Sequence, residues 1–162
     1  MRGSANIYNL PEHLQARSMC AITADTDKHR FVLGSGSVFP AQKGRNEIHV
    51  LNYSEDANRI EVEHTFKVEG LSGAMAPEVT QISSSPYNRN TLLVATQNDT
   101  DTNSVLFYQL ASESESGEIS AHKLTNEFKI ESAQPQVAIH SIVWEDHESM
   151  EGKTPTELIL AD

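Results

Sequence analysis

Short apolar runs, separated by polar stretches rich in Gly, Ser, Pro, Asn and acidic residues, follow one another along this chain of 162 residues. Such runs are typical of strands, and no segment keeps a 3.6-residue period over three turns, as a helix would. The pattern therefore predicts an all-β protein with almost no helix. The predicted strands are Ser18–Ala24, Phe31–Ser37, Glu47–Tyr53, Glu61–Lys67, Val79–Ser83, Thr91–Gln97, Val105–Leu110, Ile119–Leu124, Ile139–Trp144 and Leu158–Ala161.

The predicted strands repeat in sets. The second strand of each set begins at Phe31, Leu92 and Leu158, so the period is 61 and then 66 residues. A four-stranded propeller blade usually takes about 40–45 residues, and longer units carry long loops. The third strand of a set alternates apolar and polar residues, as in "NEIHVLNYSED" and "SVLFYQLASES", which predicts partial burial. We expect the blades of a WD40-type β-propeller.

The predicted blades divide the chain, 1–162, as the N-terminal part of a propeller. One blade covers 31–67 with a leading strand near 18–24, a second covers 79–124, and an incomplete one covers 137–162. The last run breaks off on an apolar strand, and an unpaired strand edge invites further pairing. We therefore expect a fragment of about two and a half blades that self-associates through open blade edges.

The net charge of the chain limits the class of partner it suits, and its cysteine content limits the compartment. The formal net charge is -11, which argues against nucleic acid and anionic membrane surfaces and favours protein partners of complementary charge. The single cysteine, Cys20, excludes an internal disulfide framework and fits a reducing compartment. No apolar run approaches the roughly 20 residues of a membrane span.

Several segments together resemble a known family. They are "NIYNL...LQARSM", "TADTDKHRFVLGSGSV", "NEIHVLNYSEDANRI", "EVTQISSSPYNRNTLLVATQND" and "IHSIVWED...ELILAD". In this order they are similar to the N-terminal part of the WD-repeat proteins that interact with the endosome-associated recycling protein (EARP) and Golgi-associated retrograde protein (GARP) tethering complexes. No Trp-Asp dipeptide occurs in the chain, and Asn52-Tyr53 and Gln109-Leu110 stand at the expected blade ends.

The resemblance implies a cytoplasmic seven-bladed propeller that is a scaffold, not an enzyme, and that needs no cofactor. It implies binding to multisubunit tethers at endosomes and the trans-Golgi network, in endosomal recycling, retrograde transport and dense-core vesicle maturation. Two alternatives remain open. One is an adaptor of another class, for chromatin or for ubiquitin-ligase substrates, since an acidic propeller surface suits basic peptides. The other is a propeller hydrolase, for which no grouped acid, base or nucleophile is evident.

Among residues able to do chemistry, the histidines come first. His64 and His122 fall on separate predicted strands, and His140 and His147 flank the end of another. Without an HExxH motif or paired cysteines, structural roles are favoured over zinc. The remaining candidates are interpreted in the same way. Asp99, Asp101 and Asn103 are interpreted as an exposed loop and not a calcium site, because Ser104 and Leu110 replace the required Gly and Glu. Ser112–Glu118 is interpreted as a solvated loop or, alternatively, as a phosphorylation site at Ser112–Ser116. Trp144 is interpreted as a core residue or a partner contact, and Cys20 as a small buried hydrophobe.

Overall fold

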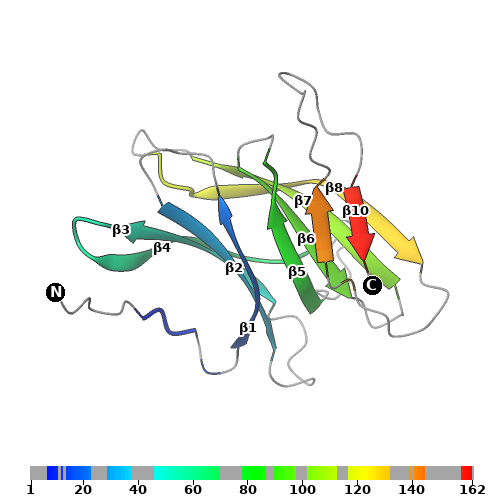
Figure 1. Ribbon diagram of the computed structural model, residues 1–162, viewed down its shortest axis with the longest axis horizontal. Coiled ribbons are helices and arrows are strands. Elements are labelled where there is room, and N and C mark those ends of the chain that lie inside the picture. The colour runs from blue at the N-terminus through cyan, green and yellow to red at the C-terminus, as the bar shows by residue number, and fades with distance from the viewer. Residues whose placement is uncertain are drawn as a thin grey trace.

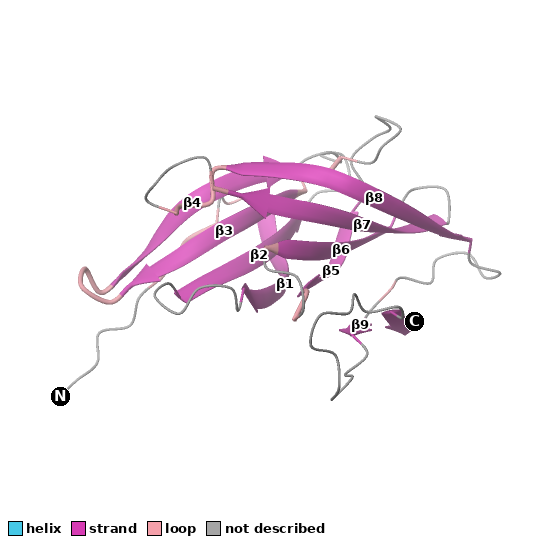
Figure 2. Cartoon of the chain, turned by 90° about the horizontal axis from the view of Figure 1, so that it is seen from above, coloured by secondary structure: helices cyan, strands magenta, loops and turns pink. Residues whose placement is uncertain are grey.

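All regular structure in the described residues of this computed structural model is β-strand (Figure 2). The structure describes residues 7–10, 12, 14–22, 29–37, 46–69, 78–86, 90–97, 102–112, 117–131, 139, 141–144 and 158–161. The strands are β1 (Leu14–Ile22), β2 (His29–Ser37), β3 (Glu47–Ser54), β4 (Arg59–Lys67), β5 (Glu78–Ser84), β6 (Thr91–Gln97), β7 (Thr102–Ala111), β8 (Ala121–Glu131), β9 (Ser141–Trp144) and β10 (Leu158–Ala161). Each predicted strand overlaps one of these, so the all-β prediction is confirmed.

The strands form two four-stranded antiparallel sheets and a two-stranded pair. Sheet A has the order β1-β2-β3-β4, and sheet B has the order β5-β6-β7-β8. Strands β9 and β10 pair with each other, and the first strands of the three groups, β1, β5 and β9, follow one another from left to right in Figure 1. Every hydrogen-bonded neighbour within a group is also the neighbour in sequence. Each sheet is therefore an up-and-down meander, the arrangement found in a propeller blade.

Asparagine residues with a left-handed backbone end two of the connections between strands. Asn58 has a φ of 47° and closes the β3–β4 hairpin, where its N–H donates to the carbonyl of Glu55 at 3.2 Å. Asn90 has a φ of 61° immediately before β6. Asparagine tolerates this region better than most side chains, because its short polar side chain bonds locally. In the hairpin, Asn58 Oδ1 accepts a bond from the Tyr53 hydroxyl at 2.9 Å.

The core has two parts, one on each side of sheet B. The larger part lies between sheets A and B and includes Val32, Ile48, Val50, Ile82, Leu92, Val94, Leu106 and Tyr108. The smaller part joins the far face of sheet B to the β9 region through Leu93, Ala95, Val105, Ile139 and Ile142. Since both faces of sheet B are covered, β6 is buried at five successive positions, from Leu92 to Thr96.

The prediction of apolar and polar alternation along β3 is wrong. Ile48, His49, Val50 and Leu51 are all buried, on both faces of the strand. Sheet B covers Ile48 and Val50, while Tyr8 reaches over His49 on the opposite face. Burial on both faces removes the polar side that alternation requires.

Candidate interaction surface

The two faces of sheet A have different neighbours. One face packs on sheet B and carries Cys20, Val32 and Val50, which lie side by side across β1, β2 and β3. The other, here called the open face, carries Met19, Phe31, Leu33, Leu51 and Val62, which the strand register places together. Of these, Met19 is 64% exposed and Val62 is 47% exposed. Leu33 and Leu51 are buried, so the exposed apolar side chains of this face lie on its two edge strands, Met19 on β1 and Val62 on β4.

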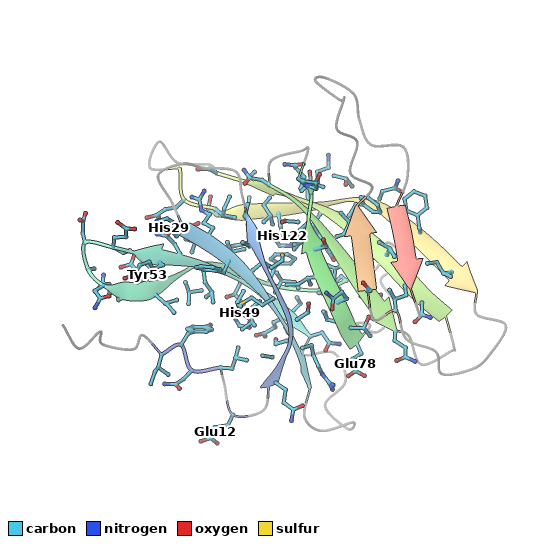
Figure 3. All side chains as sticks on the ribbon, in the orientation of Figure 1. Glu12, His29, His49, Tyr53, Glu78 and His122 are labelled. Carbon is cyan, nitrogen blue, oxygen red and sulfur yellow. The ribbon has the colours of Figure 1, made fainter. Side chains whose placement is uncertain are left out.

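A histidine is buried within the open face. The His49 Nδ1 atom lies 3.1 Å from the Tyr8 hydroxyl and 3.3 Å from the Thr65 hydroxyl, and its Nε2 atom lies 3.5 Å from the Glu47 carboxylate (Figure 3). Burial lowers the pKa of His49, although Glu47 opposes this effect. In a neutral ring with its proton on Nε2, Nδ1 accepts from the hydroxyl groups, whereas the buried Nε2 atom makes no hydrogen bond. His49 therefore holds the segment around Tyr8 against the sheet.

A buried ion pair on the other face ties sheet A to sheet B. Arg30 Nε donates to Glu63 Oε2 at 2.8 Å, and the two side chains are only 3% and 4% exposed. The same Glu63 oxygen accepts the backbone N–H of Ile119 at 3.0 Å, and Arg30 also donates to the carbonyl of Gly117. Glu63 is the residue inserted at an irregularity in β4, opposite Val50 and Leu51. Such a bulge redirects a side chain, here into the sheet interface.

Further hydrogen bonds join the inner strands β1 and β5. The backbone N–H of Ile82 donates to Ser18 Oγ at 3.1 Å, and Ser84 Oγ donates to the carbonyl of Ala21 at 2.6 Å. At the strand ends, Arg17 pairs with Glu78 at 2.7 Å. Because these groups satisfy one another across the interface, the two sheets are held in one register as well as packed.

Two histidines meet at the outer end of this interface. His64 Nε2, on β4, lies 2.9 Å from His122 Nδ1, on β8, and the His122 ring stacks on Phe66 with centroids 3.9 Å apart (Figure 3). Burial lowers the pKa of both rings; His64 lowers that of His122 further, and Glu69 raises it. Both rings are therefore neutral at pH 7, one donating to the other. Sequence reasoning placed them on separate strands, which is confirmed, but did not bring them together.

The remaining candidates from the sequence are Cys20, the possible metal ligands, the loop and serine residues, and Trp144. Cys20 is half-buried beside the core, and burial raises its pKa to about 11, so it stays a neutral thiol. Among the residues that the structure describes, no three His, Cys, Asp or Glu side chains form a metal site. Ser112 is exposed, while Asn103 and Ser104 are buried in β7 and so are not part of an exposed loop. His140, His147, Asp99, Asp101, 113–116 and the Trp144 side chain lie outside the described residues.

Sequence reasoning missed Arg30 and Glu63. Arg30 appeared only within "TADTDKHRFVLGSGSV", one of the segments that carry the family resemblance, and Glu63 only as one of two acids in "IEVEHTF". An arginine next to a buried strand, facing acids on the strand after next, was the available signal. It was weak, because the bulge that turns Glu63 inward leaves no mark in the sequence pattern.

No helix in the described ranges is long and apolar enough to span a membrane. In comparisons with known proteins, no family model and no curated protein matched the chain.

Proposed function

We propose that this protein is a non-enzymatic scaffold of the β-propeller type that acts by binding other proteins. The observation that carries this proposal is the stack of repeated four-stranded sheets, which leaves Met19 and Val62 exposed on the face of sheet A turned away from sheet B. The polar side chains between the two sheets support the proposal as well, because Arg30 binds Glu63 and His64 binds His122. Such groups maintain the packing of the blades, whereas a catalytic group is left available to a substrate.

The partners proposed are multisubunit tethering complexes of the EARP and GARP type. The proposal rests on the sequence resemblance, which extends from Ile7 to Asp162, and on the net charge of -11, which favours partners with basic surfaces. In this role the protein is cytoplasmic and peripherally associated with endosomes and the trans-Golgi network. It supports endosomal recycling, retrograde transport and dense-core vesicle maturation.

Affinity purification of the full-length protein from its own cells, followed by mass spectrometry, tests this proposal. We expect enrichment of the subunits shared by the two tethering complexes over a purification with an unrelated tagged protein. Repeating the wash at high salt weakens contacts that depend on exposed charges. Absence of the tethering subunits at both salt concentrations would contradict the trafficking role.

A second function is favoured by the same charge. An adaptor that reads basic peptides, such as histone tails or ubiquitin-ligase substrates, also suits an acidic surface. Binding of a labelled histone-tail peptide that falls steeply with salt, together with recovery of chromatin or ligase subunits from cells, would favour this function. A peptide with its lysines acetylated is the matched control, because acetylation removes the charge and leaves the chain length unchanged.

A further inference from the structure

The contact between His64 and His122 brings two possible metal ligands together where sheets A and B meet. His64 Nε2 and His122 Nδ1 lie 2.9 Å apart, although the residues are 58 positions apart in the sequence and belong to different sheets. When His64 carries its proton on Nδ1 and His122 on Nε2, both of the facing nitrogen atoms present a lone pair. Neutral imidazole is the commonest metal ligand among protein side chains.

The spacing of the two rings suits a single tetrahedral ion. Zinc binds imidazole nitrogen at about 2.0–2.1 Å, so two such ligands have nitrogen atoms roughly 3.3 Å apart and ring centroids roughly 5 Å apart. The observed ring centroids are 5.2 Å apart, with the ring planes inclined at 42°. An ion is therefore accommodated by turning the rings while their centroids stay in place.

Neighbouring side chains hold one of the rings and add negative charge. The His122 ring stacks on Phe66 with centroids 3.9 Å apart and planes inclined at 13°. The Tyr108 hydroxyl donates to the carbonyl of Glu69 at 3.1 Å and accepts the backbone N–H of Glu69 at 3.2 Å, which fixes this residue. The Glu69 carboxylate raises the pKa of His122, so its charge acts at the ring and also favours a cation there.

The pair is accessible to solvent, so water completes the coordination of an ion. His64 and His122 lie on β4 and β8, the last strands of their sheets, and His122 is exposed. Within the described part of the chain, no group of three His, Cys, Asp or Glu side chains is placed to bind one ion. Two protein ligands and water give an exchangeable site, unlike a structural zinc site with four protein ligands.

We propose that His64 Nε2 and His122 Nδ1 together bind a divalent transition-metal ion, with Zn²⁺ as the probe, and that the ion links the outer strands of sheets A and B. The two ligands come from different sheets, so the site exists only when the sheets are packed together. An ion that binds only the folded chain stabilises it increasingly as the free ion concentration rises. This inference goes beyond the proposed function and does not depend on it.

Thermal melting of the purified 162-residue chain, first with EDTA and then with increasing Zn²⁺, tests this link between the sheets. We expect the Tm to rise with Zn²⁺ and not with Mg²⁺, which prefers oxygen ligands. His64→Gln and His122→Gln should each weaken the zinc affinity by about tenfold or more, because even the loss of an outer-shell partner costs about 10–100-fold. The matched control is His29→Gln, since His29 is exposed and pairs with Glu55 at 2.9 Å. This variant should keep the full rise in Tm.

NMR of the histidine ring nitrogens identifies the ligating atoms directly. In the ¹⁵N-labelled unmodified chain, Zn²⁺ should shift Nε2 of His64 and Nδ1 of His122 together. This measurement needs no variant, so it decides the question even where a substitution impairs folding. A Tm that does not respond to Zn²⁺, a full response retained in both glutamine variants, or shifts confined to other histidines would each overturn the proposal.

Discussion

Sheets A and B follow the same four-stranded plan, but they differ in what covers them. Sheet B has sheet A on one face and the β9 region on the other, and its central strand β6 is buried over five successive residues. Sheet A has sheet B on one face; on its other face Leu33, His49 and Leu51 are buried, whereas Met19 and Val62 on the edge strands remain exposed. Equivalent residues of the two sheets are therefore similarly apolar because of the repeat, but an apolar side chain stabilises the fold only where a neighbouring sheet buries it.

The largest effect is expected where the two sheets are joined by the buried ion pair. Arg30→Ala leaves the Glu63 carboxylate buried without its partner, which costs about 3–5 kcal/mol of unfolding free energy. Urea unfolding at pH 7 measures this loss. The exposed pair Arg59–Glu61 on the same sheet is the control, because exposed pairs contribute only about 0–1 kcal/mol.

A double variant sharpens the interpretation of this pair. Arg30→Met with Glu63→Leu removes both charges and keeps apolar volume, so it should recover most of the stability lost in Arg30→Ala. If Arg30→Ala unfolds with the same free energy as the unmodified chain, the ion pair does not hold the sheets together.

Truncation at one position of the repeat compares the two sheets directly, because Met19 and Ile82 pair with the third residues, Leu33 and Val94, of the equivalent strands that begin at Phe31 and Leu92. Ile82→Ala opens a cavity between the sheets and should cost about 2–5 kcal/mol of unfolding free energy. Met19→Ala, at the same position of sheet A, should change it by no more than about 0.5 kcal/mol in the monomer, because the side chain is exposed. Dilute samples in urea give both values without self-association. Equal losses in the two variants would show that the open face is covered in solution.

The close approach at Gly34 gives the next largest effect. An added methyl group would stand 2.9 Å from a Val79 methyl carbon, so Gly34→Ala should overpack the interface and cost about 1–3 kcal/mol. Gly36→Ala is the matched control. Its new methyl group would meet the flexible side chain of Arg17, which can move away. A thermal melt of both variants distinguishes them, and equal melting temperatures would contradict close packing at Gly34.

The smallest effect is a pH dependence of the contact between His64 and His122. Burial lowers the pKa of both rings below the ordinary value of 6.5, and they also face each other, Glu69 and Tyr108. The unfolded chain therefore binds protons first as the pH falls. Stability is retained above pH 6.5 and is lost as the pH falls from 6.5 through the lowered pKa values.

Urea unfolding between pH 7.5 and 5 measures this loss. The double variant His64→Gln, His122→Gln should show a shallower decline with pH than the unmodified chain. Some decline remains, because burial also lowers the pKa of His49. If the double variant shows the same slope, the histidine pair does not contribute to the pH dependence of the unfolding free energy.

The positions of the strands followed from the sequence because each strand is a local run of apolar residues between turn residues. All ten predicted strands overlap observed ones, including the short β9 and β10. The repeat of Phe31, Leu92 and Leu158 also follows from the sequence, since equivalent positions need similar side chains to pack alike. Candidate sites were harder, and His64 and His122 show why. A contact between residues 58 positions apart depends on how two sheets stack.

Tertiary structure alone decided which faces are covered. The residue types in "FVLG" and "LLVA" do not show which face of a strand packs on a neighbouring sheet and which is exposed to solvent. Burial of both faces of β3 and the inward turn of Glu63 at a bulge likewise arise from packing between sheets. The sequence by itself determined the strands and their repeat, because these depend on neighbours along the chain. The interface and the open face depend on neighbours in space, which only the stacked sheets bring together.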